Sequence, residues 1–333
     1  MSATPPAARD HGGNLTAAIA SYGGAWEDWI DLSTGINPAP YPVGEIAPAL
    51  WARLPDLALT ERLIDAARAA YGAAGCIAVT AGAQQAIDTI PHLYPAGEAR
   101  ILAPTYNEHA AALRHAGWRV TEVATLDALR GADLAVVVNP NNPDGACYTR
   151  EALLALLADV GVLVVDESFG DPVPALSLAG DTGREGLWVL RSFGKFYGLA
   201  GIRLGFALAA PAAVEALTTR LGPWPVNGPA MAIGTRALRD VAWQEETIVR
   251  LCADSARLDA LVPWTCVGGT PLFRLYRTPD AAAVQAHLAR HHIWTRIFPY
   301  SPHLVRLGLP HPAQWARLEA SLRGLTERDP ANG

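Results

Sequence analysis

From about residue 58 to residue 210, short apolar runs alternate with longer segments whose apolar residues recur three and four positions apart. Runs rich in β-branched residues favour buried strands, and the longer spacing is that of one face of an amphipathic helix. The runs that we expect as strands are CIAVT, RILAP, WRVTEV, DLAVVVNP, VLVVDES, LWVLRSF and IRLGFALA. This alternation predicts an α/β fold with a mostly parallel sheet flanked by helices.

Two of the helical segments carry end signals. In residues 59–72 we expect Thr60 as the N-cap and Gly72 as the stop, and Thr149 is the expected cap of the helix in TREALLALLADVG. Hydroxyl side chains accept hydrogen bonds from free N–H groups at helix starts, and glycine adopts the left-handed backbone at helix ends.

The pattern changes at both ends of the chain. After LGPWPVNGPA, a long helical stretch leads into PLFRLYRT, a further helix, IWTRIF, HLVRLGLP and a last helix, which predicts a smaller α+β domain. The first 45 residues are rich in Gly, Pro and Asn and are expected to form an extended arm. We therefore divide the chain into an arm (1–45), a large domain (46–225) and a small domain (226–333).

The composition narrows the class of protein. Of the 333 residues, 50% are hydrophobic and 17% are charged, which is typical of a compact globular chain. The net charge is −6 and no basic run is present, so we expect no nucleic acid as a partner. No apolar run is long enough to cross a bilayer and the N-terminus lacks a signal-peptide core, so we expect a cytoplasmic protein with no membrane partner. The four cysteines form no CxxC pair, and neither a metal site nor a disulfide framework is expected.

One basic residue stands apart from the others. The chain has 26 lysine and arginine residues, and Lys195 is the only lysine among them. Arginine equals or exceeds lysine in ion pairs and phosphate contacts, but it cannot supply an amine that loses its proton and adds to a carbonyl. Lys195 could also be a chance residue on a solvated face.

Polar residues follow several of the predicted strands, at the edge where open α/β sheets bind ligands. Ala83 and Gln84 open a helix after CIAVT, where a phosphate would meet free N–H groups. Asp166 ends VLVVDES and could accept a protonated ring nitrogen, although a capping role is an alternative. Tyr106 could stack on a flat cofactor. The Asn-Pro turn VVVNPNNPDG could direct Asn139, Asn141 or Asn142 to the same edge.

The segment around Lys195 completes this set. Ser192 and Arg203 flank the lysine in SFGKFYGLAGIR, and a hydroxyl and a guanidinium suit a phosphorylated cofactor. An amine, a carboxylate, a phosphate cup and a stacking aromatic ring together indicate pyridoxal 5'-phosphate.

The motifs SFGKFYGLAGIRLG and NPNNPDG resemble those of the class I and II aminotransferases, which are fold-type I pyridoxal-phosphate enzymes with a seven-stranded type of sheet. This resemblance implies that Lys195 binds the cofactor covalently and that Asp166 pairs with the pyridine nitrogen. It also implies roles for the remaining cofactor-binding candidates. Asn142 would bond the ring hydroxyl and Tyr106 would stack on the ring, while the phosphate would be held by Ser192, Arg203, Ala83 and Gln84.

The N-terminal DHGGN followed by DLSTGINPAPYP is similar to the threonine-phosphate decarboxylases of cobalamin biosynthesis. The resemblance implies decarboxylation of L-threonine O-3-phosphate to (R)-1-amino-2-propanol O-2-phosphate. Arg306 would bind the substrate carboxylate and Arg296 the phosphate. Asn142, His11 and the amide of Gly35 would also face the substrate. A histidinol-phosphate-type aminotransferase remains the alternative, as does a catalytically silent domain.

Two departures from the family pattern stand out. Leu54 occupies a position where relatives carry a tyrosine that reaches the cofactor phosphate of the partner subunit. Phe169 replaces a tyrosine that bonds the ring hydroxyl, so Asn142 would make that contact alone. The family also implies a homodimer.

Overall fold

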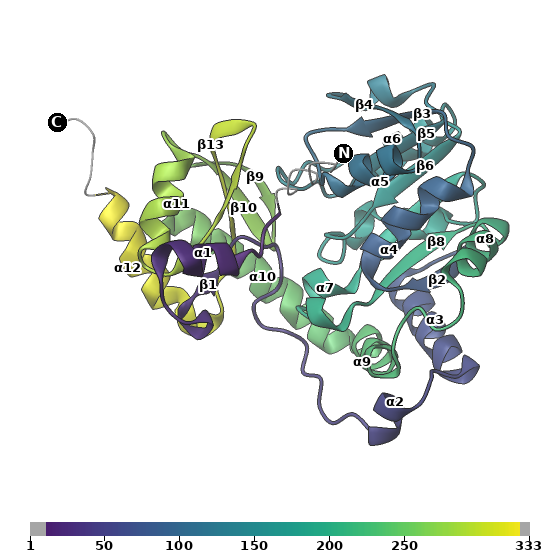
Figure 1. Ribbon diagram of the computed structural model, residues 1–333, viewed down its shortest axis with the longest axis horizontal. Helices are drawn as coiled ribbons and strands as arrows, with labels where there is room; N and C mark the ends of the chain where they lie inside the picture. The colour runs from purple at the N-terminus through teal and green to yellow at the C-terminus, as the bar shows by residue number, and fades with distance from the viewer. Residues whose placement is uncertain (1–10, 327–333) are drawn as a thin grey trace, which may run out of the picture.

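The computed structural model describes residues 11–326, and this part contains two main sheets of different type and a short two-stranded sheet (Figure 1). The larger sheet has seven strands in the order β2-β8-β7-β6-β5-β3-β4. Its strands are β2 (Cys76–Thr80), β3 (Glu98–Leu102), β4 (Arg119–Val123), β5 (Leu134–Val138), β6 (Val162–Asp166), β7 (Leu187–Ser192) and β8 (Gly205–Ala209). Neighbours from β7 to β4 are parallel, whereas β8 is antiparallel to both β7 and β2. The predicted mostly parallel sheet is confirmed.

Helices cover both faces of this sheet, which explains why its central strands are apolar throughout. On β5, Ala135 and Val137 join one buried cluster, and Leu134 and Val136 join another. The first cluster includes residues of α3 (Leu57–Tyr71) and α6 (Arg150–Leu157), and the second includes residues of α4 (Gly82–Thr89), α5 (Glu108–His115) and α8 (Pro211–Leu221). Alternate residues of one strand thus pack into opposite cores.

The smaller sheet is antiparallel, with the order β12-β13-β10-β9. Its strands are β9 (Thr265–Thr270), β10 (Phe273–Arg277), β12 (Arg296–Phe298) and β13 (Ser301–Gly308). Helices α11 (Ala281–Ala289) and α12 (Trp315–Thr326) lie on the side of this sheet that is away from the large sheet (Figure 1). Helices α9 (Gly228–Arg239) and α10 (Val241–Leu261) precede this sheet in the chain. The long α10 extends from α9, beside the large sheet, to the small sheet (Figure 1).

The N-terminal segment is not the extended arm that we expected. It contains α1 (Leu15–Tyr22) and β1 (Ile30–Asp31), and β1 pairs in parallel with β11 (Ile293–Trp294). Asn14 caps α1 by accepting from the N–H of Ala17 at 3.3 Å. After β1 the chain crosses to the large sheet and reaches α2 (Pro48–Ala52) (Figure 1).

One predicted cap is wrong and two predicted ends are confirmed. Asp56 caps α3, because its carboxylate accepts from the N–H of Leu59 at 2.7 Å, and Thr60 lies inside the helix. Gly72 ends α3 with a φ of 62°, and the Thr149 hydroxyl accepts from Ala152 at the start of α6.

Short helical turns complete the chain, and no described helix could cross a membrane. The turns are α7 (Phe193–Phe196), η1 (Trp26–Asp28), η2 (Ile90–Leu93), η3 (Asp127–Leu129), η4 (Pro174–Leu176), η5 (Ala179–Asp181), η6 (Ala200–Ile202) and η7 (Pro312–Gln314). Between residues 11 and 326, no helix combines the length and the apolar character that a membrane span needs.

Candidate active site

A cavity of about 460 Å³ lies where the N-terminal segment, the large sheet and the small sheet meet. Its lining includes many of the residues predicted from the sequence, among them His11, Gly35, Tyr106, Asn142, Lys195, Arg296 and Arg306. The polar groups come from segments far apart in the chain, because the carboxyl ends of the parallel strands open toward this edge.

Lys195 lies in α7, directly after β7, and its side chain reaches the cavity. Its Nζ lies 5.7 Å from the centre of the Phe169 ring. Burial lowers the pKa of Lys195 to about 8, and the nearby Arg306 and Arg203 act in the same direction, against Asp166. A solvated chance position is therefore excluded, and the amine loses its proton more readily than an ordinary lysine.

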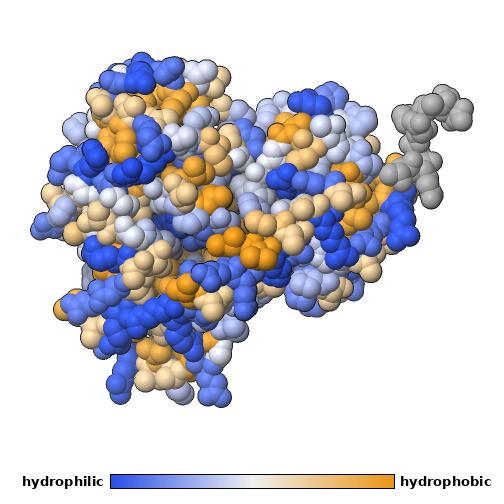
Figure 2. Space-filling model, turned by 180° about the vertical axis from the view of Figure 1, so that it is seen from behind, coloured by the Kyte–Doolittle hydropathy of each residue, from blue (hydrophilic) through white to orange (hydrophobic). Residues whose placement is uncertain are grey.

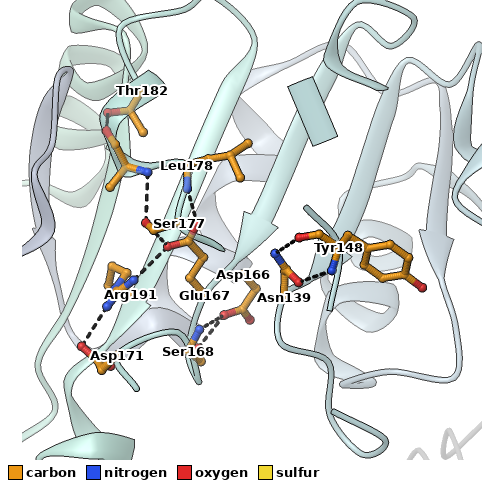
Figure 3. A network of polar contacts seen from close by, with 11 residues as sticks. Asn139, Tyr148, Asp166, Glu167, Ser168, Asp171, Ser177, Leu178, Thr182 and Arg191 are labelled. Carbon is orange, nitrogen blue, oxygen red and sulfur yellow. Dashed lines mark hydrogen bonds and ion pairs between the residues drawn. The ribbon is translucent and has the colours of Figure 1, made fainter. Parts of the chain in front are cut away.

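Asp166 ends β6 and is 2% exposed. Its Oδ2 lies 2.9 Å from Nε2 of His109. Its Oδ1 accepts from the backbone N–H of Ser168 at 2.9 Å and from the Ser168 hydroxyl (Figure 3). A carboxylate only accepts, so Nε2 carries the proton in this pair. Burial opposes the charged form, but the bonds from His109 and Ser168 outweigh it and lower the pKa of Asp166.

The loop that follows Asp166 is held by a second buried network (Figure 3). Arg191, on β7, donates to Glu167 at 2.8 Å and to Asp171 at 2.8 Å. Glu167 also accepts from the hydroxyl of Ser177 and from the N–H of Leu178. The network joins the ends of β6 and β7, the strands that position Asp166 and Lys195.

The predicted phosphate cup gathers at the start of α4. Gly82 has a φ of 74°, and a Cβ built there would lie 2.6 Å from Nη2 of Arg203. A Cβ on Gly205 would lie 2.4 Å from the backbone nitrogen of Ala83, and Gly205 pairs with Ser192 across β7 and β8. The helix start, the guanidinium and the serine are thus brought together by two close approaches that need glycine.

Tyr106 contacts both Gln84, at the start of α4, and His109, the partner of Asp166. Its hydroxyl donates to Oε1 of Gln84 at 3.1 Å, and its ring meets the His109 ring edge-on at 6.2 Å. Burial, together with Glu108 and Asp166, raises the pKa of Tyr106 to about 12, so the phenol stays protonated at neutral pH.

Of the three asparagines in the Asn-Pro turn, Asn142 lines the cavity. Asn139 instead donates to the carbonyl of Tyr148 and accepts from its N–H (Figure 3). The Asn141 amide donates to Pro104 and Asp144, within the turn and the neighbouring loop.

Arg306, on β13, connects Asn142 with the N-terminal segment. Its Nη1 donates to Oδ1 of Asn142, and its Nη2 donates to the carbonyl of Ser33 at 2.6 Å. Burial and the neighbouring Arg296 lower the pKa of Arg306 to about 10, so the guanidinium remains charged at neutral pH. Its Nε is buried and has no hydrogen-bond partner within residues 11–326.

The N-terminal segment supplies the remaining wall of the cavity. His11 lies 2.9 Å from Oε1 of Glu108, at the start of α5. A Cβ on Gly35 would lie 2.8 Å from the Phe169 ring and 2.9 Å from the Phe273 ring, so the chain passes very close to both rings.

The two departures from the family pattern are located as follows. Phe169 lies in the cavity wall and stacks edge-on with Phe273 at 5.0 Å, so it offers no hydroxyl. Leu54 lies between α2 and α3 with 66% of its surface exposed, away from the cavity lining.

The arrangement fits pyridoxal phosphate. Lys195 supplies a buried amine, Asp166 a carboxylate held in its charged form, and the start of α4 with Arg203 a site for a phosphate. Tyr106 and Phe169 provide aromatic walls, and the unpartnered Nε of Arg306 provides a further donor.

The sequence reasoning did not identify His109, Ser168 or Glu108. His109 follows Tyr106 by three residues and lies in the first turn of a predicted helix, close in sequence to a residue already expected at the site. That spacing was the available signal for a second polar group beside Asp166.

The chain is similar to known proteins both in sequence and in fold. Residues 41–318 match the family model for aminotransferase class I and II. The chain is 43% identical to a threonine-phosphate decarboxylase of Pseudomonas aeruginosa, covering 96% of this chain and 98% of that protein. It is 42% identical to a threonine-phosphate decarboxylase of a Sinorhizobium species, covering 94% and 97%. A histidinol-phosphate aminotransferase from Sinorhizobium meliloti in complex with pyridoxal-5'-phosphate has a TM-score of 0.79 and 19% identity, covering 94% of each chain, which shows the fold.

Proposed function

The chain belongs to the aminotransferase class I and II family of pyridoxal-phosphate enzymes, and on that premise we propose that it decarboxylates L-threonine O-3-phosphate to (R)-1-amino-2-propanol O-2-phosphate. The observation that carries the proposal is the pair of arginines, Arg306 and Arg296, in the wall of the cavity that holds Lys195. A substrate with a carboxylate at one end and a phosphate at the other offers each guanidinium an anion. Similarity to two threonine-phosphate decarboxylases over nearly the whole chain supports the same assignment.

Pyridoxal phosphate would supply an electron sink for the bond that breaks at Cα of the substrate. Lys195 would hold the cofactor through its amine, and Asp166 would accept a hydrogen bond from the ring nitrogen. The start of α4, Ser192 and Arg203 would hold the phosphate, and Asn142 the ring hydroxyl. Tyr106 would lie against the ring.

The residues of the chain would then direct which bond breaks. Arg306 would fix the substrate carboxylate, and Ser33 and Asn142 hold the guanidinium in place. Because the orientation of the substrate carboxylate would separate decarboxylation from amino transfer, Arg306 would be the residue that selects the reaction. Once its amine is free, Lys195 can return a proton to Cα, because burial gives it a pKa of about 8. Arg296, with His11 and Gly35, would bind the phosphate and close the cavity from the N-terminal side.

We also propose the finer features that the family relationship suggests. The product would serve cobalamin biosynthesis in the cytoplasm. The arm (1–45), large domain (46–225) and small domain (226–333) would act as separate parts of one site. Large apolar side chains on and beside α2 are exposed, namely Trp51, Leu54 and Leu57, and they support a homodimer that buries this face. Further apolar residues reach the surface on the face seen in Figure 2.

The test is to incubate the cofactor-loaded protein with L-threonine O-3-phosphate, without a keto acid, and to follow CO₂ and the phosphorylated amine. Formation of CO₂ and the phosphorylated amine in equal amounts over many turnovers, abolished in Lys195→Ala, would establish the decarboxylase. No CO₂, with amino transfer from histidinol phosphate to 2-oxoglutarate, would instead establish the aminotransferase. Absence of both, with no visible absorption from added cofactor, would establish a silent domain.

A further inference from the structure

The short helix that carries Lys195 ends in carbonyl groups that receive their hydrogen bonds from the N-terminal segment. Helix α7 has only four residues, so its last carbonyls cannot be satisfied within the helix. The backbone N–H of Asn37 donates to the carbonyl of Lys195 at 2.9 Å, and the N–H of Tyr41 donates to Tyr197 at 2.9 Å. The side-chain amide of Asn37 donates to the carbonyl of Phe196 at 2.8 Å.

This contact depends on a close approach of two backbones. Gly198 has a φ of 68°, and a Cβ there would lie 2.7 Å from the carbonyl oxygen of Asn37 and 2.8 Å from Cα of Pro40. The N–H of Gly198 also donates to the carbonyl of Lys195, at 3.3 Å, so Asn37 makes the shorter bond to that oxygen. The lysine turn and residues 37–41 therefore pack directly against each other.

The other side of the Asn37 amide faces the small domain. Its Oδ1 accepts from Nη2 of Arg250, on α10, at 2.7 Å, and from the N–H of Ala39 at 3.0 Å. Arg250 also donates to Asp254, one turn further along α10, at 3.2 Å. Asn37 is 1% exposed, so each of its amide atoms is used by a buried bond.

The same segment reaches the substrate side of the cavity only a few residues earlier. Ser33 accepts from Arg306, and Gly35 lies against the Phe169 ring. A single residue, Ile36, separates Gly35 from Asn37. A shift of the segment at the cavity wall therefore reaches the lysine turn through an unbroken backbone.

We propose that Asn37 is a positioning residue for Lys195, which ties the lysine turn to the segment that covers the cavity and, through Arg250, to helix α10 of the small domain. The inference rests on the proposed role of Lys195 as the residue that holds the cofactor. It does not depend on which substrate is bound. Its function is to fix the direction in which the amine enters the cavity, and to couple that direction to the seating of the N-terminal segment and of α10.

The single lysine makes a direct test possible. We would treat the cofactor-free, full-length protein with acetic anhydride over a range of pH and measure acetylation of the Lys195 peptide by mass spectrometry. The charged groups that act on Lys195 from the neighbouring elements are Asp166, Arg203 and Arg306, and all three remain in the variants. We expect Asn37→Ala to move the midpoint of the labelling profile upward by about one pH unit from a wild-type value near 8, because a loosened turn lets water reach the amine.

Two further variants distinguish the bond of Asn37 to the lysine turn from its bond to Arg250. Asn37→Ser loses the donation to Phe196 without adding a charge beside Lys195, and it tests the tie to the lysine turn. Arg250→Gln tests the tie to α10, and we expect a smaller upward shift. If Arg250 acts through Asn37, the double variant Asn37→Ala/Arg250→Gln shifts the midpoint no further than Asn37→Ala.

Asn139→Ala is the matched control. Asn139 is also an asparagine with 1% exposure and two bonds to backbone groups, but these bonds go to Tyr148. It should lose comparable stability and leave the labelling midpoint in place. The proposal is wrong if the Asn37 variants label like the wild type, or if Asn139→Ala shifts the midpoint equally. Should Asn37→Ala not fold, Asn37→Ser and Arg250→Gln decide the question by the same readout. The test uses no substrate, so its outcome is independent of decarboxylation.

Discussion

Nε2 of His109 lies 2.9 Å from Oδ2 of Asp166, and both side chains are almost completely buried. A buried carboxylate favours its neutral form unless hydrogen bonds or cations hold its charge. His109 and Ser168 supply those bonds, and their effect exceeds that of burial. His109 therefore helps to keep Asp166 charged, which is the form that the proposed contact with a protonated ring nitrogen needs.

We expect His109→Leu to reduce kcat/KM by about 10- to 100-fold, the cost of a lost hydrogen bond to a charged group. The pKa of Asp166 should rise, because burial is then opposed by Ser168 alone. The activity needs the charged carboxylate, so the acidic side of the pH profile should move to higher pH. His109→Gln, which retains an N–H donor, serves as the control. An unchanged acidic limb in His109→Leu would show that the histidine has no such role.

Lys195 makes the cofactor-free protein less stable at neutral pH. Its pKa falls from 10.5 to about 8 on folding, so between these values the unfolded chain binds a proton that the folded chain has lost. Stability therefore rises with pH across this window, and below pH 8 the full cost of burying the charge applies. We expect Lys195→Met to raise the free energy of unfolding at pH 7 by up to about 3 kcal/mol. Urea denaturation at pH 7 and pH 10 measures the difference, which should shrink at the higher pH.

Replacing Arg306 should impair substrate binding more than folding. Arg306→Lys keeps a charge but loses the planar fork that bonds a carboxylate at two oxygens. We expect KM for L-threonine O-3-phosphate to rise by about 10- to 100-fold, measured by steady-state kinetics. The control is Arg277→Lys, an exposed arginine on the adjacent strand β10, which should leave KM unaltered. Equal effects of both replacements would contradict the assignment.

The network around Arg191 should act on stability. Arg191→Met leaves Glu167 and Asp171 buried without their cation, and breaking a buried ion pair costs about 3–5 kcal/mol. The free energy of unfolding, measured by urea denaturation, should fall by that amount, whereas replacement of the exposed Arg114, which pairs with Glu122, should cost less than about 1 kcal/mol. A loss below 1 kcal/mol for Arg191→Met would show that the loop after β6 has other support.

The sequence predicted the large sheet well, because most of its strands are short apolar runs and the helices that cover it have apolar residues three and four positions apart. It missed β9, since TCVGGT contains two glycines and shows little apolar alternation. It also missed the helix in the N-terminal segment, where Gly, Pro and Asn on both sides of α1 hide a short helical run.

Residues that we propose to contact the cofactor, such as Lys195 and Asp166, could be nominated from residue type and position. Residues that act through another residue were not. His109 and Asn37 reach Asp166 and the lysine turn across 57 and 159 positions of sequence, and no local pattern reports such pairs. The N-cap of α3 failed for a simpler reason, since Asp56 and Thr60 both suit a cap and only the backbone decides between them.

The bonds made by Asn37 also constrain the order in which a newly made chain can become competent. During synthesis residues 37–41 leave the ribosome early, but the carbonyls that they bind lie in residues 195–197, and Arg250 follows 213 positions after Asn37. Until about three quarters of the chain has been made, the lysine turn lacks part of its support. A nascent chain shorter than this would contain Lys195 without the setting that orients its amine.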